Sequence, residues 1–519
     1  MENTGFSLVT LVLLLPLVGF FIILFFQKEE QAETIKWTAL ITSIVTFVAA
    51  LLLWAGFDNT QAGLQFVTQW SWLPSYGISF AVGVDGLSLL MIVMTTFIMP
   101  LAILSSFRVH VLEERGRIKL YFLFMLLLEF AMLGVFLAQD LFVFYIFWEI
   151  SLVPMYFLIG IWGAERRVYA AVKFFLYTMA GSILMLLAIL YVGNAAHTFS
   201  VPDIIAAVQS GALKLPFDGL FSTQGLLFLG FLIAFAIKVP IWPLHSWLPD
   251  AHVQAPTAGS VILAGVMLKL GTYGIVRFCL PLFPQAAVQW APIIAVLAII
   301  GIIYGAWVSY AQTDVKKLVA YSSVSHLGFV VLGIFAMTAA GIQGGILQMV
   351  NHGVSTGGLF LVVGMLYERR HTKAMDAYGG IWKALPLLGG LALIITLSSM
   401  GLPGLNGFVG EFTILLGTFG STVLGFFYTL FATLGVILSA IYLLYMFQKV
   451  FMGELDKEEN KHLAPLHWQE IAVLVPILIA IFLIGLQPAP FFATMDATVA
   501  HVVTQVGPYI PTVARNVAP

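Results

Sequence analysis

Long apolar runs constrain this chain more than any other feature. Fourteen stretches of at least 18 residues are almost wholly apolar, which is enough for a helix to cross the hydrocarbon core of a membrane. Only 9% of the 519 residues are charged, against about 25% in soluble domains. We therefore expect an all-α, multi-pass membrane protein of about 14 transmembrane helices at 6–26, 36–56, 85–107, 119–138, 141–162, 168–193, 223–242, 254–279, 289–310, 317–337, 341–366, 385–418, 422–448 and 469–487.

Two of these runs contain helix-breaking residues. In the seventh run, Pro240 and Pro243 follow closely on Lys238, and in the twelfth, Pro403 lies near the middle of a run too long for one crossing. We expect helices 7 and 12 to be discontinuous, because a membrane tolerates broken helices only where protein or water satisfies the freed backbone groups. The breaks are five helices apart, which predicts inverted five-helix repeats formed by helices 4–8 and 9–13.

These repeats divide the chain into four expected parts: residues 1–118 with helices 1–3, the first repeat at 119–280, the second at 281–449, and helix 14 with a tail at 450–519. Basic residues support this order, since 18 of the 23 lysines and arginines, Lys316 and Lys317 among them, fall in loops after odd-numbered helices. Those loops are expected to face the cytoplasm and both termini the periplasm, in a bacterial plasma membrane.

Other function classes find no support in the sequence. A formal net charge of −2 offers no charged face for nucleic acid. The single cysteine, Cys279, excludes disulfides, cysteine-ligated zinc and iron–sulfur clusters on this chain. Glycine-rich nucleotide-binding motifs are also absent. We therefore expect no cofactor here, and any redox chemistry would belong to partner subunits.

A few titratable residues lie within the apolar runs. An intramembrane charge costs roughly 2.5–3.5 kcal/mol or more, so each marks a candidate functional site. Glu149 and Lys238 are expected to form an ion pair, since pairing lets two buried charges persist; the alternative is a structural carboxylate tied to a neighbouring helix. Lys269 lies about 22 Å along its helix, too deep for the alternative of snorkelling to a surface. The full set is Glu129, Glu149, Lys238, Lys269, His326, His352 and Glu411.

Two histidines sit on adjacent helices among small and hydroxylated residues. His326 and His352 could be hydrogen-bond anchors, but they link a lysine-bearing half to a glutamate-bearing half, which favours a proton relay. Glu411 follows the break of helix 12 and so mirrors Lys238 with the opposite charge.

Three further residues are given no catalytic role. Glu129 is interpreted as a solitary protonated carboxyl. His245 and His252 have a spacing that suggests zinc at first sight, but prolines between them preclude one regular helix and no thiolate is near. Structural hydrogen bonding in a loop is the preferred interpretation for both.

Two motifs carry a family resemblance. The stretch from His245 to Thr257, running on to Lys269, resembles the signature of the antiporter-like membrane subunits of respiratory complex I and of multisubunit Na+/H+ antiporters. Glu411, where sister subunits carry lysine, and the stretch Trp148 to Tyr156 make the chain similar to the M-type subunits of complex I. The resemblance implies that Glu149 and Lys238 form a coupling pair, Lys269 is the central relay, His326 and His352 are bridging histidines, and Glu411 is the terminal proton site.

The resemblance also implies a function. The chain would be a proton-translocating, non-redox subunit of an NADH (or ferredoxin):quinone oxidoreductase, without direct NADH binding. Its expected partners are L-, N- and K-type antiporter-like subunits and lipids, with flavin, iron–sulfur clusters and the quinone site on other subunits. Alternatives are the D-type subunit of a multisubunit Na+/H+ antiporter, a membrane subunit of an energy-converting hydrogenase, and a structural scaffold.

Overall fold

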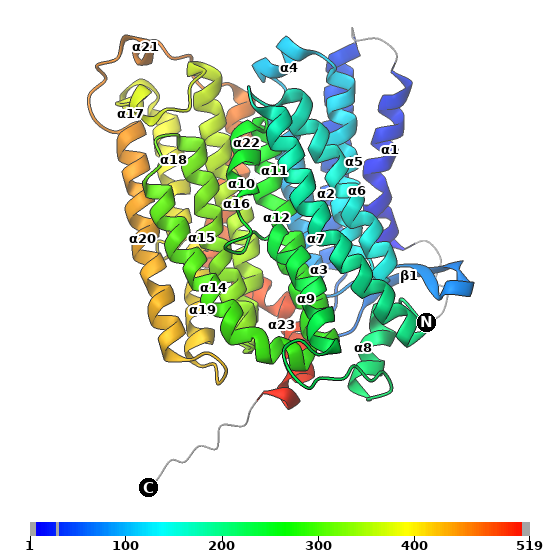
Figure 1. The fold of residues 1–519 in the computed structure, drawn as a ribbon. Helices are drawn as coiled ribbons and strands as arrows, with labels where there is room; N and C mark the ends of the chain where they lie inside the picture. The colour runs from blue at the N-terminus through cyan, green and yellow to red at the C-terminus, as the bar shows by residue number, and fades with distance from the viewer. Residues whose placement is uncertain (1–6, 27–30, 511–519) are drawn as a thin grey trace.

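The computed structural model describes residues 7–26 and 31–510, and its helices run side by side in one bundle (Figure 1). The expected all-α class is confirmed. Twelve helices of the described residues are long and apolar enough to span a membrane. They are α1 (Leu8–Phe25), α2 (Ala32–Ala55), α3 (Gly86–Ser105), α5 (Ile118–Leu137), α6 (Leu141–Trp162), α7 (Arg167–Ala196), the run α11–α13 (Thr257–Leu282), α14 (Pro284–Tyr310), α15 (Val315–Phe335), α16 (Ala339–Arg370), α20 (Phe426–Phe451) and α22 (Trp468–Leu486).

The seventh and twelfth predicted segments are each interrupted. In the seventh, expected at 223–242, α9 (Thr223–Lys238) ends at Lys238, and the next helix, α10 (Trp247–Gln254), begins only after the break. The twelfth consists of α18 (Pro386–Ser399) and α19 (Asn406–Phe419). Protein groups satisfy the backbone at the first break, where the indole of Trp247 donates to the Ile237 carbonyl at 2.8 Å. The number of crossings, the inverted relation of the repeats and the four-part division remain predictions.

Several elements were not expected. Strands β1 (Gln65–Leu73) and β2 (Ile78–Val84) form an antiparallel hairpin. The predicted tail contains an 18-residue helix, α23 (Ala489–Val506), that contacts α3. Its polar residues, such as Asp496 and His501, keep it from being one apolar run. Short helices are α4 (His110–Arg115), α8 (Val201–Gln209), α17 (Ile381–Ala384) and α21 (Glu458–Lys461), with the 3-10 turns η2 (Pro74–Tyr76), η5 (Met375–Ala377) and η6 (Gly507–Tyr509).

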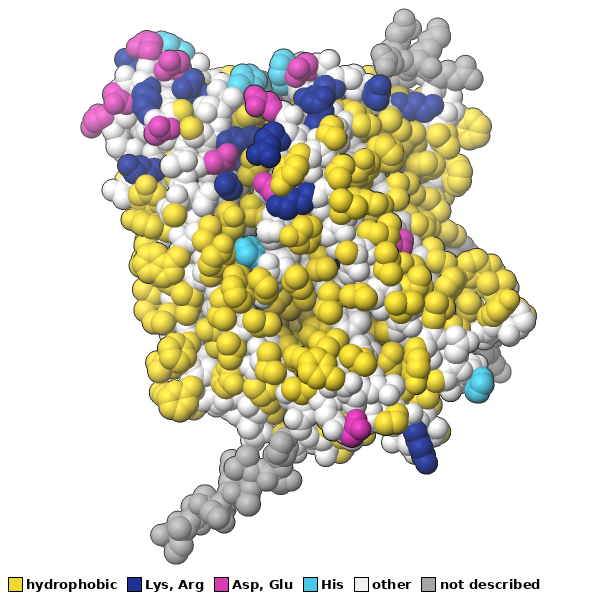
Figure 2. Space-filling view, in the orientation of Figure 1, with side chains coloured by type: hydrophobic (Ala, Val, Ile, Leu, Met, Phe, Trp, Pro, Cys, Tyr) yellow, Lys and Arg dark blue, Asp and Glu magenta, His cyan; other side chains and the backbone are white. Residues whose placement is uncertain are grey.

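The surface matches a membrane environment. Figure 2 shows a broad hydrophobic band across the face in view, with lysine, arginine and acidic side chains gathered at the end that carries α4, α17 and α21. That end is the one expected to face the cytoplasm. The protein is therefore a multi-pass integral membrane protein.

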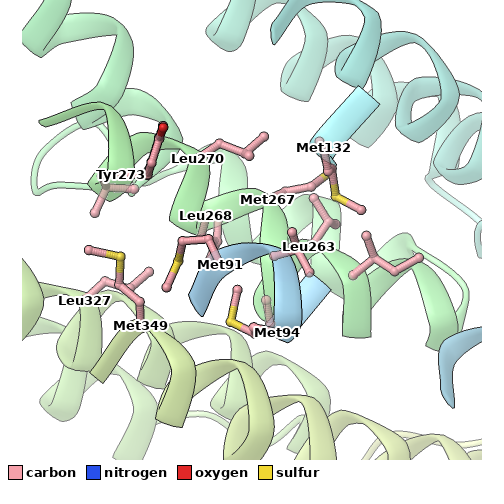
Figure 3. Packing of buried hydrophobic residues seen from close by; sticks show 14 of the residues in the cluster. Met91, Met94, Met132, Leu263, Met267, Leu268, Leu270, Tyr273, Leu327 and Met349 are labelled. Carbon is pink, nitrogen blue, oxygen red and sulfur yellow. The ribbon is translucent and has the colours of Figure 1, made fainter. Parts of the chain in front are cut away.

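The centre of the bundle is rich in methionine. Met91 and Met94 from α3, Met132 from α5 and Met349 from α16 surround the run α11–α13 (Figure 3). Methionine is unbranched and polarizable, so it fills irregular gaps around a helix of uneven shape. That run is uneven: α11 (Thr257–Ile262), α12 (Leu268–Gly274) and α13 (Leu280–Leu282) alternate with the π-helical turns η3 (Leu263–Met267) and η4 (Ile275–Cys279).

Candidate functional site

Four of the six expected site residues lie together in the middle of the bundle. The Lys269 ammonium lies 2.7 Å from Nδ1 of His352, and the rings of His352 and His326 have centroids 6.0 Å apart. Nδ1 of His326 then lies 2.9 Å from Oε1 of Glu411. All four side chains are buried. We call this row, Lys269–His352–His326–Glu411, the central chain.

The π-helical turn η3 helps to position Lys269. Besides the contact with His352, the ammonium donates to the carbonyl of Ala264, inside η3. A π turn breaks the regular ladder of backbone hydrogen bonds and is frequent at functional sites. Gly353 lets α16 approach this turn, because a Cβ there would stand 2.9 Å from the Gly265 carbonyl oxygen.

The far end of the central chain is anchored by polar neighbours. Gln348 donates to Oε1 of Glu411 at 3.1 Å, and Nε2 of His326 lies 3.1 Å from the Tyr442 hydroxyl. Oε2 of Glu411 is buried and has no hydrogen-bond partner in the described part of the chain. It faces the break of the twelfth segment, where Gly401 has φ +82 and a Cβ would come within 3.2 Å of it. One carboxylate oxygen is thus fixed by two contacts, and the other is without a partner among the described residues.

A small cavity lies between the two histidines. It measures about 10 Å³ and is lined by both rings together with hydroxyl and amide side chains, including Ser355, Asn351 and Ser398. This is close to the ~10–15 Å³ that a single water needs. Nε2 of His352 is buried and unpartnered within the described residues. The space and the open nitrogen together suit a bridging water between the rings.

The expected ion pair between Lys238 and Glu149 is not formed, so that prediction is wrong for this structure. Lys238 ends α9, and no ion pair or hydrogen bond joins its ammonium to any described residue. It lies over two aromatic rings instead, 5.3 Å from the centroid of Trp148 and 5.5 Å from that of Phe174. The physical reason is that aromatic faces attract a desolvated cation by about 2 kcal/mol or more, which competes with a pairing contact.

Glu149 nevertheless remains electrostatically linked to Lys238. Its charge acts on the buried ammonium, and Tyr145, four residues earlier on α6, lies close to it. Glu149 is half-buried, and its Oε1 is buried without a hydrogen-bond partner among the described residues. The pair is therefore separated but still coupled.

Two further buried residues, His252 and Lys316, were not among the predicted site residues. His252 was assigned to structural hydrogen bonding, yet both ring nitrogens are buried without a partner in the described ranges, and the ring stacks on Phe360 at 4.7 Å. Lys316 was counted as a loop charge but is 7% exposed and donates to the Ala255 carbonyl at 2.6 Å. The signal for His252 was its place in the motif that ends at Lys269; nothing in the sequence separates Lys316 from Lys317.

Other candidate residues lie outside the central chain. Glu129 is fully buried on α5 and accepts a hydrogen bond from Ser43 at 3.2 Å. His245 is buried beside the ring of Tyr304, with centroids 5.2 Å apart. Among the described residues, no group of three or more histidine, cysteine or acidic side chains could hold a metal ion.

A bundle with two broken helices and buried lysine, histidine and glutamate in contact defines an antiporter-like membrane subunit. The family model described as "NADH:quinone oxidoreductase/Mrp antiporter, TM" matches residues 138–441, and the chain belongs to this family. Within it, the chain is an M-type, antiporter-like subunit of complex I.

Relatives and a solved structure support that placement. The chain is 45% identical over 487 residues to NADH-quinone oxidoreductase subunit M of Rhodobacter capsulatus, covering 93% of each protein. It is 39% identical to the subunit M of Escherichia coli, covering 94% of this chain and 96% of that one. A chain of respiratory complex I from Thermus thermophilus superposes with a TM-score of 0.85 at 33% identity, over 96% of this chain and all of that one.

Proposed function

We propose that this protein translocates protons along its central chain of titratable side chains. It would do so as a subunit of a complex I-type NADH (or ferredoxin):quinone oxidoreductase, without redox chemistry of its own. The observation that carries this proposal is the row from Lys269 to Glu411, which buries four titratable groups in a hydrophobic bundle. Apolar residues would hold the helices together at lower free-energy cost, so a purely structural role does not account for them.

The contacts along the central chain support one route for the proton. Lys269 gives its proton to Nδ1 of His352, which releases one from Nε2 toward the cavity between the rings. His326 gains a proton at Nε2, beside the Tyr442 hydroxyl, and gives one from Nδ1 to Oε1 of Glu411. Rotation of the protonated carboxyl then turns this proton to the position of the unpartnered Oε2, from which it leaves. A water in the cavity would join the two histidines, since water-mediated contacts are nearly as favourable as direct ones.

Lys238 and Glu149 are proposed to control this transfer by making and breaking their contact. Unit charges about 4 Å apart at an effective dielectric near 20 attract by roughly 4 kcal/mol. A buried cation–π contact reaches about 2 kcal/mol, so the aromatic position of Lys238 competes with the paired one. Moving a charge against a potential of order 200 mV costs about 4.6 kcal/mol. The free energy of making or breaking the Lys238–Glu149 contact is thus similar to the free energy of moving one proton across the membrane, so the contact could gate that proton. The driving energy comes from partner subunits.

The assembly follows from the family. Other membrane-arm subunits of complex I are the partners, and we place flavin, iron–sulfur clusters and the quinone site on subunits other than this one. The named relatives are subunits of NADH-quinone oxidoreductases, which favours this function over a Na+/H+ antiporter. We propose a bacterial plasma membrane with the basic end facing the cytoplasm. The terminal residues themselves lie outside the described ranges.

The test compares two buried glutamates that differ in position. Glu411→Gln removes the end of the central chain, whereas Glu129→Gln makes the same change at a buried carboxyl off the chain. In proteoliposomes containing the whole complex, Glu411→Gln should lose most NADH-driven proton uptake and Glu129→Gln should keep it. Assembly is checked by native gel. Equal pumping by both assembled variants would contradict the proposal.

A further inference from the structure

Two adjacent pockets open at the basic end of the bundle. The wider one measures about 510 Å³ and is rimmed by histidines of α4, of the end of α16 and of the segment before α22, such as His110 and His467. A narrower pocket of about 110 Å³ lies beside it. The two pockets share His110, Glu368 and His371 in their lining, and we call them together the cytoplasmic funnel.

Two lysines line the narrow part of the funnel. Lys316 donates to the Ala255 carbonyl at 2.6 Å, and Lys373 donates to the Val253 carbonyl at 2.7 Å. Both ammonium groups are therefore held at the junction between α10 and α11. Their charges act on each other, and Asp314 acts on both. Burial lowers the pKa of Lys373, and the nearby carboxylates Asp314 and Glu165 oppose that effect.

His252 lies next to these acceptors in sequence, directly before Val253. Its ring nitrogens are unpartnered in the described ranges, and the charges of Lys316 and Lys269 both act on it. The charge of His252 in turn acts on His352 of the central chain. Electrostatic coupling through His252 thus links the two lysines to the central chain.

We propose that Lys316 and Lys373 make the narrower pocket of the cytoplasmic funnel, which we call the neck, exclude metal cations. The neck admits protons and rejects sodium and potassium ions. The inference rests on the proposed function, because it concerns selectivity of the same proton route. Two positive charges repel a metal cation that must shed its water to pass. A proton avoids this barrier, since the Lys316 ammonium hands its own proton inward to His252 and takes another from water in the funnel.

The test uses the whole complex in proteoliposomes and radioactive sodium as the probe. Lys316→Glu should raise sodium uptake during NADH oxidation on the order of tenfold, because the barrier changes sign. Lys317→Glu is the matched control, being the next residue on α15 but only half-buried, and it should leave uptake unchanged. Lys316→Arg keeps the charge and should stay sodium-tight.

Each outcome decides the proposal. If Lys316→Glu does not assemble, Lys373→Gln tests the same neck with a milder change and should also raise sodium uptake. Sodium uptake at the wild-type level in an assembled neck variant would overturn the inference. Failure of the proton function itself would be seen separately, as normal pumping by Glu411→Gln.

Discussion

The two intramembrane lysines show that burial alone does not define a residue's role. Lys269 contacts a histidine and a backbone carbonyl, whereas the Lys238 ammonium lies over two aromatic rings and has no hydrogen bond to any described residue. The first is positioned to pass a proton on. The second is held by cation–π attraction, which is weaker than an ion pair and does not fix the position of the ammonium. Lys238 can therefore move toward Glu149.

The cation–π contacts of Lys238 predict the effect of replacing Trp148, the larger of the two rings. Trp148→Leu abolishes one aromatic face beside Lys238, so the ammonium should move to Glu149 and the pair should stay closed. NADH-driven proton pumping in proteoliposomes should fall about tenfold, the change expected when roughly 1.4 kcal/mol of cation–π attraction is lost. Trp148→Phe retains an aromatic face and should pump at no less than about half the wild-type rate. Equal loss in both variants would show that the ring matters only for packing.

At the scale of elements, helix contacts depend on glycines that no apolar pattern reveals. Gly417 on α19 faces Gly341 on α16, where a Cβ would lie 2.1 Å from the Gly341 backbone nitrogen. Small residues let membrane helices approach closely, and this contact orients α19, which carries Glu411.

Gly417→Ala should therefore separate α16 from α19. Overpacking costs about 1–3 kcal/mol, so the purified complex should melt at lower temperature and pump less, as the Glu411–His326 contact lengthens. Gly390→Ala on α18 is the control, because nothing lies within 4 Å of its added Cβ. Unchanged melting of the Gly417 variant would mean that the helices relax without penalty.

The elements also show what the sequence could predict. Lys269, His326, His352 and Glu411 stood out because each interrupts an apolar run, and the prolines near Lys238 and at Pro403 marked both breaks. The separation of Lys238 from Glu149 could not be predicted from the sequence. It depends on the side-chain rotamer of Lys238, which brings the ammonium over the rings of Trp148 and Phe174. The hairpin of β1 and β2 was missed because it follows two apolar helices and forms no long run of its own.

The burial of Lys316 and His252 could not be predicted from the sequence either. Lys316 and Lys317 are identical neighbours, and only helix orientation buries the first and leaves the second half-exposed. His252 lies among prolines at a helix end, a setting typical of loop hydrogen bonds. That its ring nitrogens have no partner in the described part of the chain follows from α16, which brings Phe360 against the ring from a distant part of the sequence.

For the whole molecule, the proposed direction of proton movement depends on which end of the bundle faces the cytoplasm. The basic end carries the funnel and the opposite end carries α8 and the loop after it (Figures 1 and 2). Short loops rich in lysine and arginine stay on the cytoplasmic side during insertion, which predicts that the funnel faces the cytoplasm.

Cysteine labelling can test this orientation, because the native Cys279 is fully buried. Ala212→Cys lies in the exposed segment after α8, and Ala464→Cys lies in the exposed segment before α22. A membrane-impermeant maleimide should label Ala212→Cys in intact spheroplasts and Ala464→Cys only in inverted vesicles. The two substitutions are chemically identical, so a difference in labelling reports sidedness alone. The reverse pattern would place the funnel outside and make it a release path instead of an uptake path.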